Sequence, residues 1–198
     1  MDLKGENAAF WRQIAPGYDR LIDDDYKSMI QRIVEEVGPV DRVLDVATGT
    51  GFIALEVAKN VGRVEGIDFV PEMITAARIK AHERAISNAH FSLGSAYELG
   101  FPDHSFDAVI ISNSLHVMRT PEQALMESRR VLKPEGVLVV PTFCLGETED
   151  SKRKIRKLSE KGFEVYHFFT VDRFTQLVQK LGFRVIKSEL LVSIDLPM

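Results

Sequence analysis

The feature that most constrains this chain is the run of residues 43–55, VLDVATGTGFIAL. An apolar stretch is interrupted by one carboxylate, Asp45, then reaches Gly49 and Gly51 and continues with the spacing of a helix. This order predicts a strand, a tight turn and a helix start, because glycine permits backbone angles and close approaches that a side chain forbids. A helix that begins at such a turn directs free N–H groups toward an anionic or polar ligand. The sequence therefore predicts a nucleotide-like cofactor site at the first strand–helix turn of an open parallel sheet.

Two classes of cofactor use such a turn. Residues 49–54 also fit G-x-G-x-x-A, the dinucleotide fingerprint. Asp45 distinguishes the classes, because a buried carboxylate is costly unless it is paired. A pyrophosphate would repel Asp45, whereas an ammonium or sulfonium group would attract it. Residues 45–51, DVATGTG, resemble motif I of the class I S-adenosylmethionine-dependent methyltransferases, an acidic residue followed by G-x-G-x-G, with Ala47 at the first glycine position.

Length and composition narrow the class of protein. A chain of 198 residues predicts one domain. The net charge of −4 argues against a nucleic-acid partner. The single cysteine, Cys144, excludes an intramolecular disulfide framework and a cysteine-rich metal site, so no metal is predicted. We expect a cytoplasmic protein without an integral membrane segment, because there is no apolar run of about 18 residues and no signal-peptide pattern. Nothing in the sequence points to a particular oligomeric state.

The N-terminal segment is predicted to be helical over residues 6–37, with a break at Pro16-Gly17. Residues 10–19, FWRQIAPGYD, resemble the F-x-x-I-A-x-x-Y-D segment of small-molecule methyltransferases. In that family the segment folds over the active site, which implies that Tyr18 faces the cofactor or the substrate. For Trp11, an amphipathic helix that packs on the sheet is as good an explanation as a segment that folds over the active site.

A second predicted strand, residues 63–68, ends in a carboxylate. Asp68 follows the second glycine of the turn by 17 positions, near the offset of about 20 at which a carboxylate binds ribose hydroxyl groups. Residues 68–73, DFVPEM, resemble the family's D-x-S-P-x-M stretch. The resemblance implies that Phe69 or Met73 lies against the adenine ring. The helical spacing of Met73 is also that of a core residue.

The third and fourth predicted strands end in polar residues. After the strand that begins near His90 the chain has Ser95-Ala96, where relatives usually have Asp-Ala. The resemblance implies that the Ser95 hydroxyl binds the adenine amino group and that Ala96 contributes its backbone N–H. Asn113 and His116 follow the fourth strand, residues 106–112.

The carboxyl ends of strands at the switch point line the ligand crevice, so Asn113 and His116 should lie near the reacting centre. His116 is the histidine candidate for a catalytic base, and a histidine that packs locally in its loop explains it equally well. Tyr18 is the second candidate catalytic residue.

The C-terminal half contains further elements. We expect a helix capped by Thr120, a strand over residues 137–143, a helix ended by Gly182 and a strand over residues 183–190. The basic run at 152–157 is typical of a solvated helix face, and attraction of an anionic substrate or a membrane surface is the alternative. Residues 191–198 are short for the seventh strand that this fold usually carries.

The resemblance spans the chain, and two further blocks support it. Residues 99–107, LGFPDHSFD, resemble L-P-F-P-D-x-S-F-D, and residues 130–136, RVLKPEG, resemble R-V-L-K-P-G-G. The resemblance implies an α/β fold, a Rossmann-like, doubly wound, mostly parallel sheet with an N-terminal helical cap. We expect a single methyltransferase domain over 1–198, with the cap at 1–38, the cofactor-binding core at 39–145, and a substrate-covering segment with a C-terminal helix and strand at 146–198.

The implied function is methyl transfer from S-adenosylmethionine to a small-molecule acceptor by in-line displacement, with S-adenosylhomocysteine as product. Asp45 and the backbone of Gly49 and Gly51 would hold the methionine end, and Asp68 the ribose. One alternative is an NAD(P)-dependent oxidoreductase, against which Asp45 and the lack of a Tyr-x-x-x-Lys pair argue. The other is a non-catalytic S-adenosylmethionine-binding regulatory protein, which Ser95 and the short C-terminus leave open.

Overall fold

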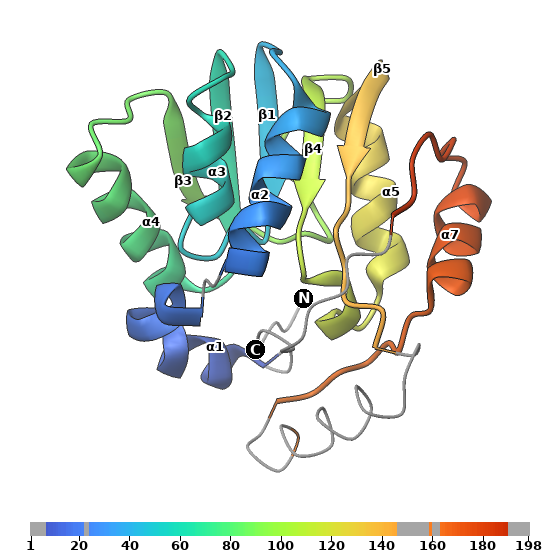
Figure 1. Ribbon diagram of the computed structural model, residues 1–198, viewed down its shortest axis with the longest axis horizontal. Coiled ribbons are helices and arrows are strands. Elements are labelled where there is room, and N and C mark those ends of the chain that lie inside the picture. Colours follow the sequence, from blue (N-terminus) through green and yellow to red (C-terminus); the bar gives the residue numbers. More distant parts are fainter. Residues whose placement is uncertain (1–6, 22–23, 146–158, 160–162, 190–198) are drawn as a thin grey trace.

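One parallel sheet of five strands forms the centre of the molecule, in the order β3-β2-β1-β4-β5 (Figure 1). The computed structural model describes residues 7–21, 24–145, 159 and 163–189. All neighbouring strands run parallel. The strands are β1 (Arg42–Val46), β2 (Arg63–Asp68), β3 (Ala89–Leu93), β4 (Phe106–Ile111) and β5 (Leu132–Val139). The predicted α/β fold with a parallel sheet is confirmed.

Helices cover both faces of the sheet, because successive side chains of a strand point in opposite directions. Val43 of β1 packs in one apolar cluster with residues of α2 (Asp24–Val37), α3 (Phe52–Val57) and α4 (Pro71–Glu83). Leu44 packs in a second cluster with residues of α5 (Pro121–Val131) and α7 (Val171–Lys180). A central strand buried on both faces explains the nearly continuous apolar sequence of β1.

The N-terminal segment consists of three pieces rather than one long helix. They are α1 (Ala8–Ile14), the 3₁₀ helix η2 (Ala15–Leu21), which contains Pro16-Gly17, and α2. In Figure 1, α1 lies beyond the ends of the strands, whereas α2 lies alongside the sheet. Ile30 and Ile33 of α2 belong to the apolar core. Of the predicted cap at 1–38, therefore, α1 and η2 lie at the carboxyl edge of the sheet and α2 is part of the core.

The order of the strands reverses between β1 and β4, so the carboxyl ends of these two strands border the crevice of the fold. Pro71 opens α4, at the first helical position that proline favours. Thr170 caps α7, since its side chain accepts a hydrogen bond from the backbone N–H of Arg173 at 3.2 Å. The predicted cap at Thr120 differs: the residue precedes α5, but its side chain makes no capping hydrogen bond.

Strand β5 begins and ends earlier than the predicted range 137–143. It starts at Leu132, which pairs with Phe106, and ends at Val139. The register shifts between Phe106 and Ala108, and β5 resumes pairing at Val137. The turn-like Lys-Pro-Glu-Gly sequence is therefore an irregularity inside the strand, not a loop before it.

The predicted strand at 183–190 is wrong for the described residues 183–189, which form no strand. Phe183 and Val185 pack against the apolar cluster of α5 and α7, whereas Ile186 is 69% exposed. One-sided packing therefore produces the alternating pattern without a neighbouring strand. Lys187 pairs with Glu36 of α2, which helps to hold this segment in place.

Two predictions lie outside the described residues: the basic run at 152–157 and the segment at 191–198. Within the described ranges, no helix has the length and hydropathy needed to span a bilayer. The described residues also contain no group of three or more metal-ligating side chains of the His, Cys, Asp or Glu type. The cytoplasmic location stays a prediction.

Candidate functional site

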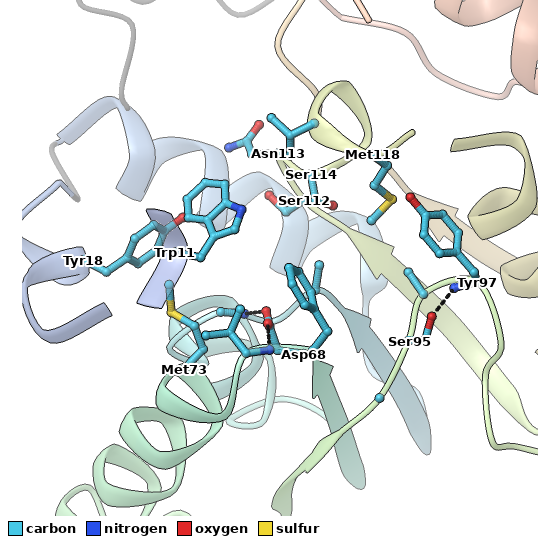
Figure 2. A pocket seen from close by; sticks show the side chains of 17 residues that line it. Trp11, Tyr18, Asp68, Met73, Ser95, Tyr97, Ser112, Asn113, Ser114 and Met118 are labelled. Atoms are coloured by element: carbon cyan, nitrogen blue, oxygen red, sulfur yellow. Dashed lines mark hydrogen bonds between the residues drawn. The ribbon is translucent and has the colours of Figure 1, made fainter. Parts of the chain in front are cut away.

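A pocket opens at the carboxyl edge of the sheet (Figure 2). Nine residues predicted for the site line it: Tyr18, Ala47, Gly49, Asp68, Phe69, Met73, Ser95, Ala96 and Asn113. Three others that we predicted, Asp45, Gly51 and His116, do not belong to the described lining. The fold thus brings together residues from the cap and from the ends of β1, β2, β3 and β4.

Asp68 is held at the end of β2 by two neighbouring turns. Its Oδ1 accepts the N–H of Val70 and its Oδ2 accepts the N–H of Gly49, both at 2.9 Å (Figure 2). Burial raises the pKa of Asp68 to about 6, and the two backbone hydrogen bonds counteract this rise. The orientation of the carboxyl group is fixed while each oxygen keeps a further lone pair, so Asp68 can accept hydrogen bonds from ligand hydroxyl groups.

The turn after β1 uses left-handed backbone at Ala47, Gly49 and Gly51. Ala47 has φ 56° and Gly49 has φ 56°. Thr48 between them donates its N–H to the carbonyl of Ile67 at 2.9 Å, which ties the turn to β2. A non-glycine residue in this region costs about 1–2 kcal/mol. The glycine that the family pattern has at position 47 is therefore explained by backbone conformation, and Ala47 adopts that conformation at a cost.

Gly51 has a packing role in the structure. It precedes α3 with φ 76°, and a Cβ atom there would lie 2.9 Å from the Cβ of Ala77 and from the ring of Phe91. The turn thus packs against α4 and β3 at a distance that only glycine permits. The predicted contact between Gly51 and a cofactor stays a prediction, since the residue is not among the described lining residues.

Asp45 is also absent from the described lining, and 1% of its surface is exposed. Its Oδ2 accepts the hydroxyl of Thr48 at 2.6 Å. Burial raises the pKa of Asp45 to about 7, the Thr48 hydrogen bond counteracts the rise, and the charge of Asp68 adds to it. Two buried carboxyl groups next to one pocket favour a cationic ligand. The predicted contact of Asp45 with the methionine end stays a prediction.

These two pKa values predict how the stability of the unliganded protein depends on pH. The folded state holds protons on Asp45 and Asp68 up to about pH 7 and 6, whereas the unfolded chain releases them near pH 4. The free energy of unfolding should therefore fall as pH rises from about 4 to 7, by up to about 1.4 kcal/mol per pH unit for each group.

Thermal unfolding measured across this pH range checks the prediction. Asp45→Asn removes one titrating group and keeps an acceptor for Thr48, so its melting temperature should depend less on pH than that of the wild type. The assignment of these pKa directions is wrong if the two proteins show the same pH dependence.

The cap contributes two aromatic residues, Trp11 and Tyr18, to the pocket (Figure 2). Their rings meet edge to face with centroids 6.3 Å apart. Burial, followed by the neighbouring Tyr26 and Asp68, raises the pKa of Tyr18 well above its ordinary value. A side-chain hydrogen bond with Tyr26 contributes to this rise in pKa, and the hydroxyl of Tyr18 therefore stays protonated near neutral pH.

The opposite side of the pocket carries smaller polar groups. The Ser95 hydroxyl accepts the N–H of Tyr97 at 3.2 Å and retains its own proton (Figure 2). Asn113 has φ 48°, and its N–H donates to the carbonyl of Pro141 at 2.9 Å. The buried Ser114 hydroxyl has no hydrogen-bond partner within the described structure. A ligand polar group is therefore a suitable partner for Ser114.

The His116 side chain is packed inside the loop that follows β4. It is 4% exposed, and its ring meets Phe143 edge to face with centroids 5.2 Å apart. Burial, followed by the charge of His167, lowers the pKa of His116 to about 3. The residue is neutral near pH 7 and outside the described pocket lining. Its role as a catalytic base stays a prediction.

Sequence reasoning did not assign several lining residues to the site: Trp11, Val70, Gly94, Tyr97, Ser112, Ser114, Val117 and Met118. Most of them adjoin predicted residues, so the loops themselves were identified. The direction of each side chain was not, because an irregular loop has no periodicity that separates its inner from its outer face.

Comparisons with known proteins agree with this geometry. The family described as Methyltransferase domain matches residues 39–182. The ubiquinone/menaquinone biosynthesis C-methyltransferase UbiE of Citrifermentans bemidjiense is 33% identical over 191 residues, which cover 90% of this chain and 74% of that protein. The demethylmenaquinone methyltransferase of Renibacterium salmoninarum is 39% identical over 146 residues, which cover 70% and 59%.

Solved structures show the same fold. A chain from the complex between the Haloferax volcanii Trm112 methyltransferase activator and the putative methyltransferase superposes with a TM-score of 0.79. It is 21% identical, and the match covers 94% of this chain and 81% of that one. At this identity the likeness concerns the fold alone.

Proposed function

The chain belongs to the methyltransferase domain family and is an S-adenosylmethionine-dependent methyltransferase, and from this premise we propose that it methylates a carbon atom of a quinone-type ring. The names of its relatives in Citrifermentans bemidjiense and Renibacterium salmoninarum support this acceptor class. The observation that carries the proposal is the division of the pocket between a carboxylate and an apolar wall. Asp68 lies on one side, and Trp11, Val117 and Met118 supply apolar surface.

The residues of the pocket fit S-adenosylmethionine. The Asp68 carboxyl group is oriented for ribose hydroxyl groups, Gly49 adds no side chain to the wall, and the Ser114 hydroxyl lacks a partner within the described structure. We place the adenine ring near Ser95, with the apolar Phe69 and Met73 against it.

The bound cofactor supplies an electrophilic methyl group. Such a displacement needs little covalent chemistry from the protein, so catalysis depends on holding donor and acceptor in line and excluding water. Trp11 and Tyr18 close the pocket from the cap side, which serves both requirements.

In transfer to a ring carbon, the bond from that carbon to the methyl group forms as the bond from sulfur to the methyl group breaks, and the carbon then releases its proton to solvent water. Electron donation from a neighbouring hydroxyl group makes the carbon nucleophilic, so the reduced, quinol form is the reactive acceptor. Tyr18 keeps its proton and lies in the pocket, so we assign it a hydrogen bond to an acceptor oxygen. The ring of His116 is enclosed beside Phe143, so we assign it no proton transfer.

Incubation of the purified protein with methyl-labelled S-adenosylmethionine tests the acceptor. We expect label in a reduced demethylnaphthoquinone, attached to carbon, and much less label in simple phenols or primary amines. Asp68→Ala serves as the control for transfer that does not require the cofactor site. Label found only on oxygen or nitrogen would show that the acceptor class is wrong, while the family assignment would stand.

The two alternative functions are set aside by the comparisons. The family match is to methyltransferases, not to dehydrogenases, and named relatives are enzymes. Addition of NADH should therefore leave the melting temperature unchanged, while S-adenosylhomocysteine raises it.

A further inference from the structure

Asp19, the residue that follows Tyr18 in η2, joins three separate elements. Thr50 lies between the two glycines of the cofactor turn, and its hydroxyl donates a hydrogen bond to Oδ1 of Asp19 at 2.6 Å. Lys80 of α4 donates its Nζ to Oδ1 at 2.8 Å and to Oδ2 at 2.6 Å. One carboxylate of the cap is thus bound both to the cofactor turn and to the helix after β2.

These contacts are shielded from solvent more than an ordinary surface ion pair. Thr50 is 2% exposed and the Lys80 side chain is 14% exposed, whereas the Asp19 side chain is 40% exposed. Burial lowers the pKa of Lys80, and its bonds with Asp19 counteract that shift. Loss of Asp19 would leave a mostly buried ammonium group and a buried hydroxyl without this partner, which costs more than breaking an exposed pair.

The network acts beside the pocket without forming its described wall. Asp19, Thr50 and Lys80 are not among the lining residues, whereas Tyr18 and Gly49 are. A methyl group placed on Gly49 would lie 3.8 Å from the Tyr18 ring. Each end of the Asp19–Thr50 bond therefore adjoins a lining residue, and the bond fixes the distance between the cap and the cofactor turn.

We propose that Asp19, through Thr50 and Lys80, is a positioning residue that latches the N-terminal segment over the cofactor and slows its release. The proposal rests on the proposed function, in that Tyr18 covers bound S-adenosylmethionine. The latch holds Tyr18 and Trp11 over the ligand in the closed state. Breaking it raises the dissociation rate constant and leaves the contacts of Asp68 intact.

Trp11 is the sole tryptophan of the chain and lies in the cap, so its fluorescence reports ligand binding there. Stopped-flow displacement of S-adenosylhomocysteine then gives the dissociation rate constant. Asp19→Ala and Lys80→Met should each raise it on the order of tenfold, with the association rate constant changed less than about twofold. Asp19→Asn keeps an acceptor for Thr50 and should give an intermediate rate.

The matched control is Lys59→Met, which removes an exposed lysine paired with Glu56 of α3. It should leave both rate constants unchanged. The Asp19→Ala, Lys80→Met double variant should release ligand no faster than Asp19→Ala, because both changes break one network. The latch would be overturned by an unchanged dissociation rate constant in Asp19→Ala, by additive effects in the double variant, or by an association rate constant that changes as much as the dissociation rate constant. Failure of the wild type to bind S-adenosylhomocysteine would instead count against the proposed function.

Discussion

Asp68→Ala is expected to weaken the binding of S-adenosylmethionine on the order of a hundredfold or more. Hydrogen bonds to a charged acceptor contribute about 1.5–3 kcal/mol each, and the Asp68 carboxylate offers two oxygens to the ribose hydroxyl groups. The same oxygens hold the N–H groups of Gly49 and Val70 at 2.9 Å. The substitution therefore also loosens the two turns that shape the pocket.

Thermal unfolding with and without ligand measures this effect. A ligand at a hundredfold excess over its Kd adds about 2.7 kcal/mol, which corresponds to about 5–10 °C for a domain of this size. The wild type should show that rise with S-adenosylmethionine, and Asp68→Ala should show little or none at the same concentration.

A second carboxylate provides the matched control. Asp107 of β4 accepts the N–H of Arg42 at 2.8 Å and pairs with Lys133, and it lies at the start of its strand, away from the pocket. Asp107→Ala should reduce the melting temperature while leaving the ligand-induced rise intact. If Asp68→Ala binds ligand as tightly as Asp107→Ala, the assignment of Asp68 to the ribose must be abandoned.

The largest loss of stability is expected from Gly51→Ala. Alanine at φ 76° costs about 1–2 kcal/mol, and its Cβ would lie 2.9 Å from both Ala77 and Phe91. Overpacking of this kind adds about 1–3 kcal/mol. The free energy of unfolding should therefore fall by about 2–5 kcal/mol, measured by chemical denaturation of the unliganded protein.

Gly38→Ala separates the two causes of that loss. Gly38 has φ 65° but no atom within 4 Å of the position where a Cβ would be. The free energy of unfolding of Gly38→Ala should therefore fall only by the backbone contribution of about 1–2 kcal/mol. Equal losses in Gly51→Ala and Gly38→Ala would mean that the close packing at Gly51 contributes nothing.

Local chemistry explains why much of the fold was predictable. The strand, turn and helix around Gly49 follow from neighbouring residues, and so does the start of α4 at Pro71. Asp68 was identified because the end of a strand and a fixed offset from the turn define its place. The strand predicted at 183–190 failed for the opposite reason, since a strand needs a partner that no local pattern specifies.

Local patterns in the sequence predicted the cofactor turn and the carboxylate at the end of β2, because both depend on dihedral preferences and periodicity over a few residues. The resemblance to the methyltransferase family predicted the doubly wound α/β architecture. Tertiary structure alone decided that Asp45, Gly51 and His116 lie outside the described pocket lining, and that Asp19 contacts Thr50 and Lys80. These outcomes depend on which elements pack together and at what distance, and such contacts join residues far apart in the chain.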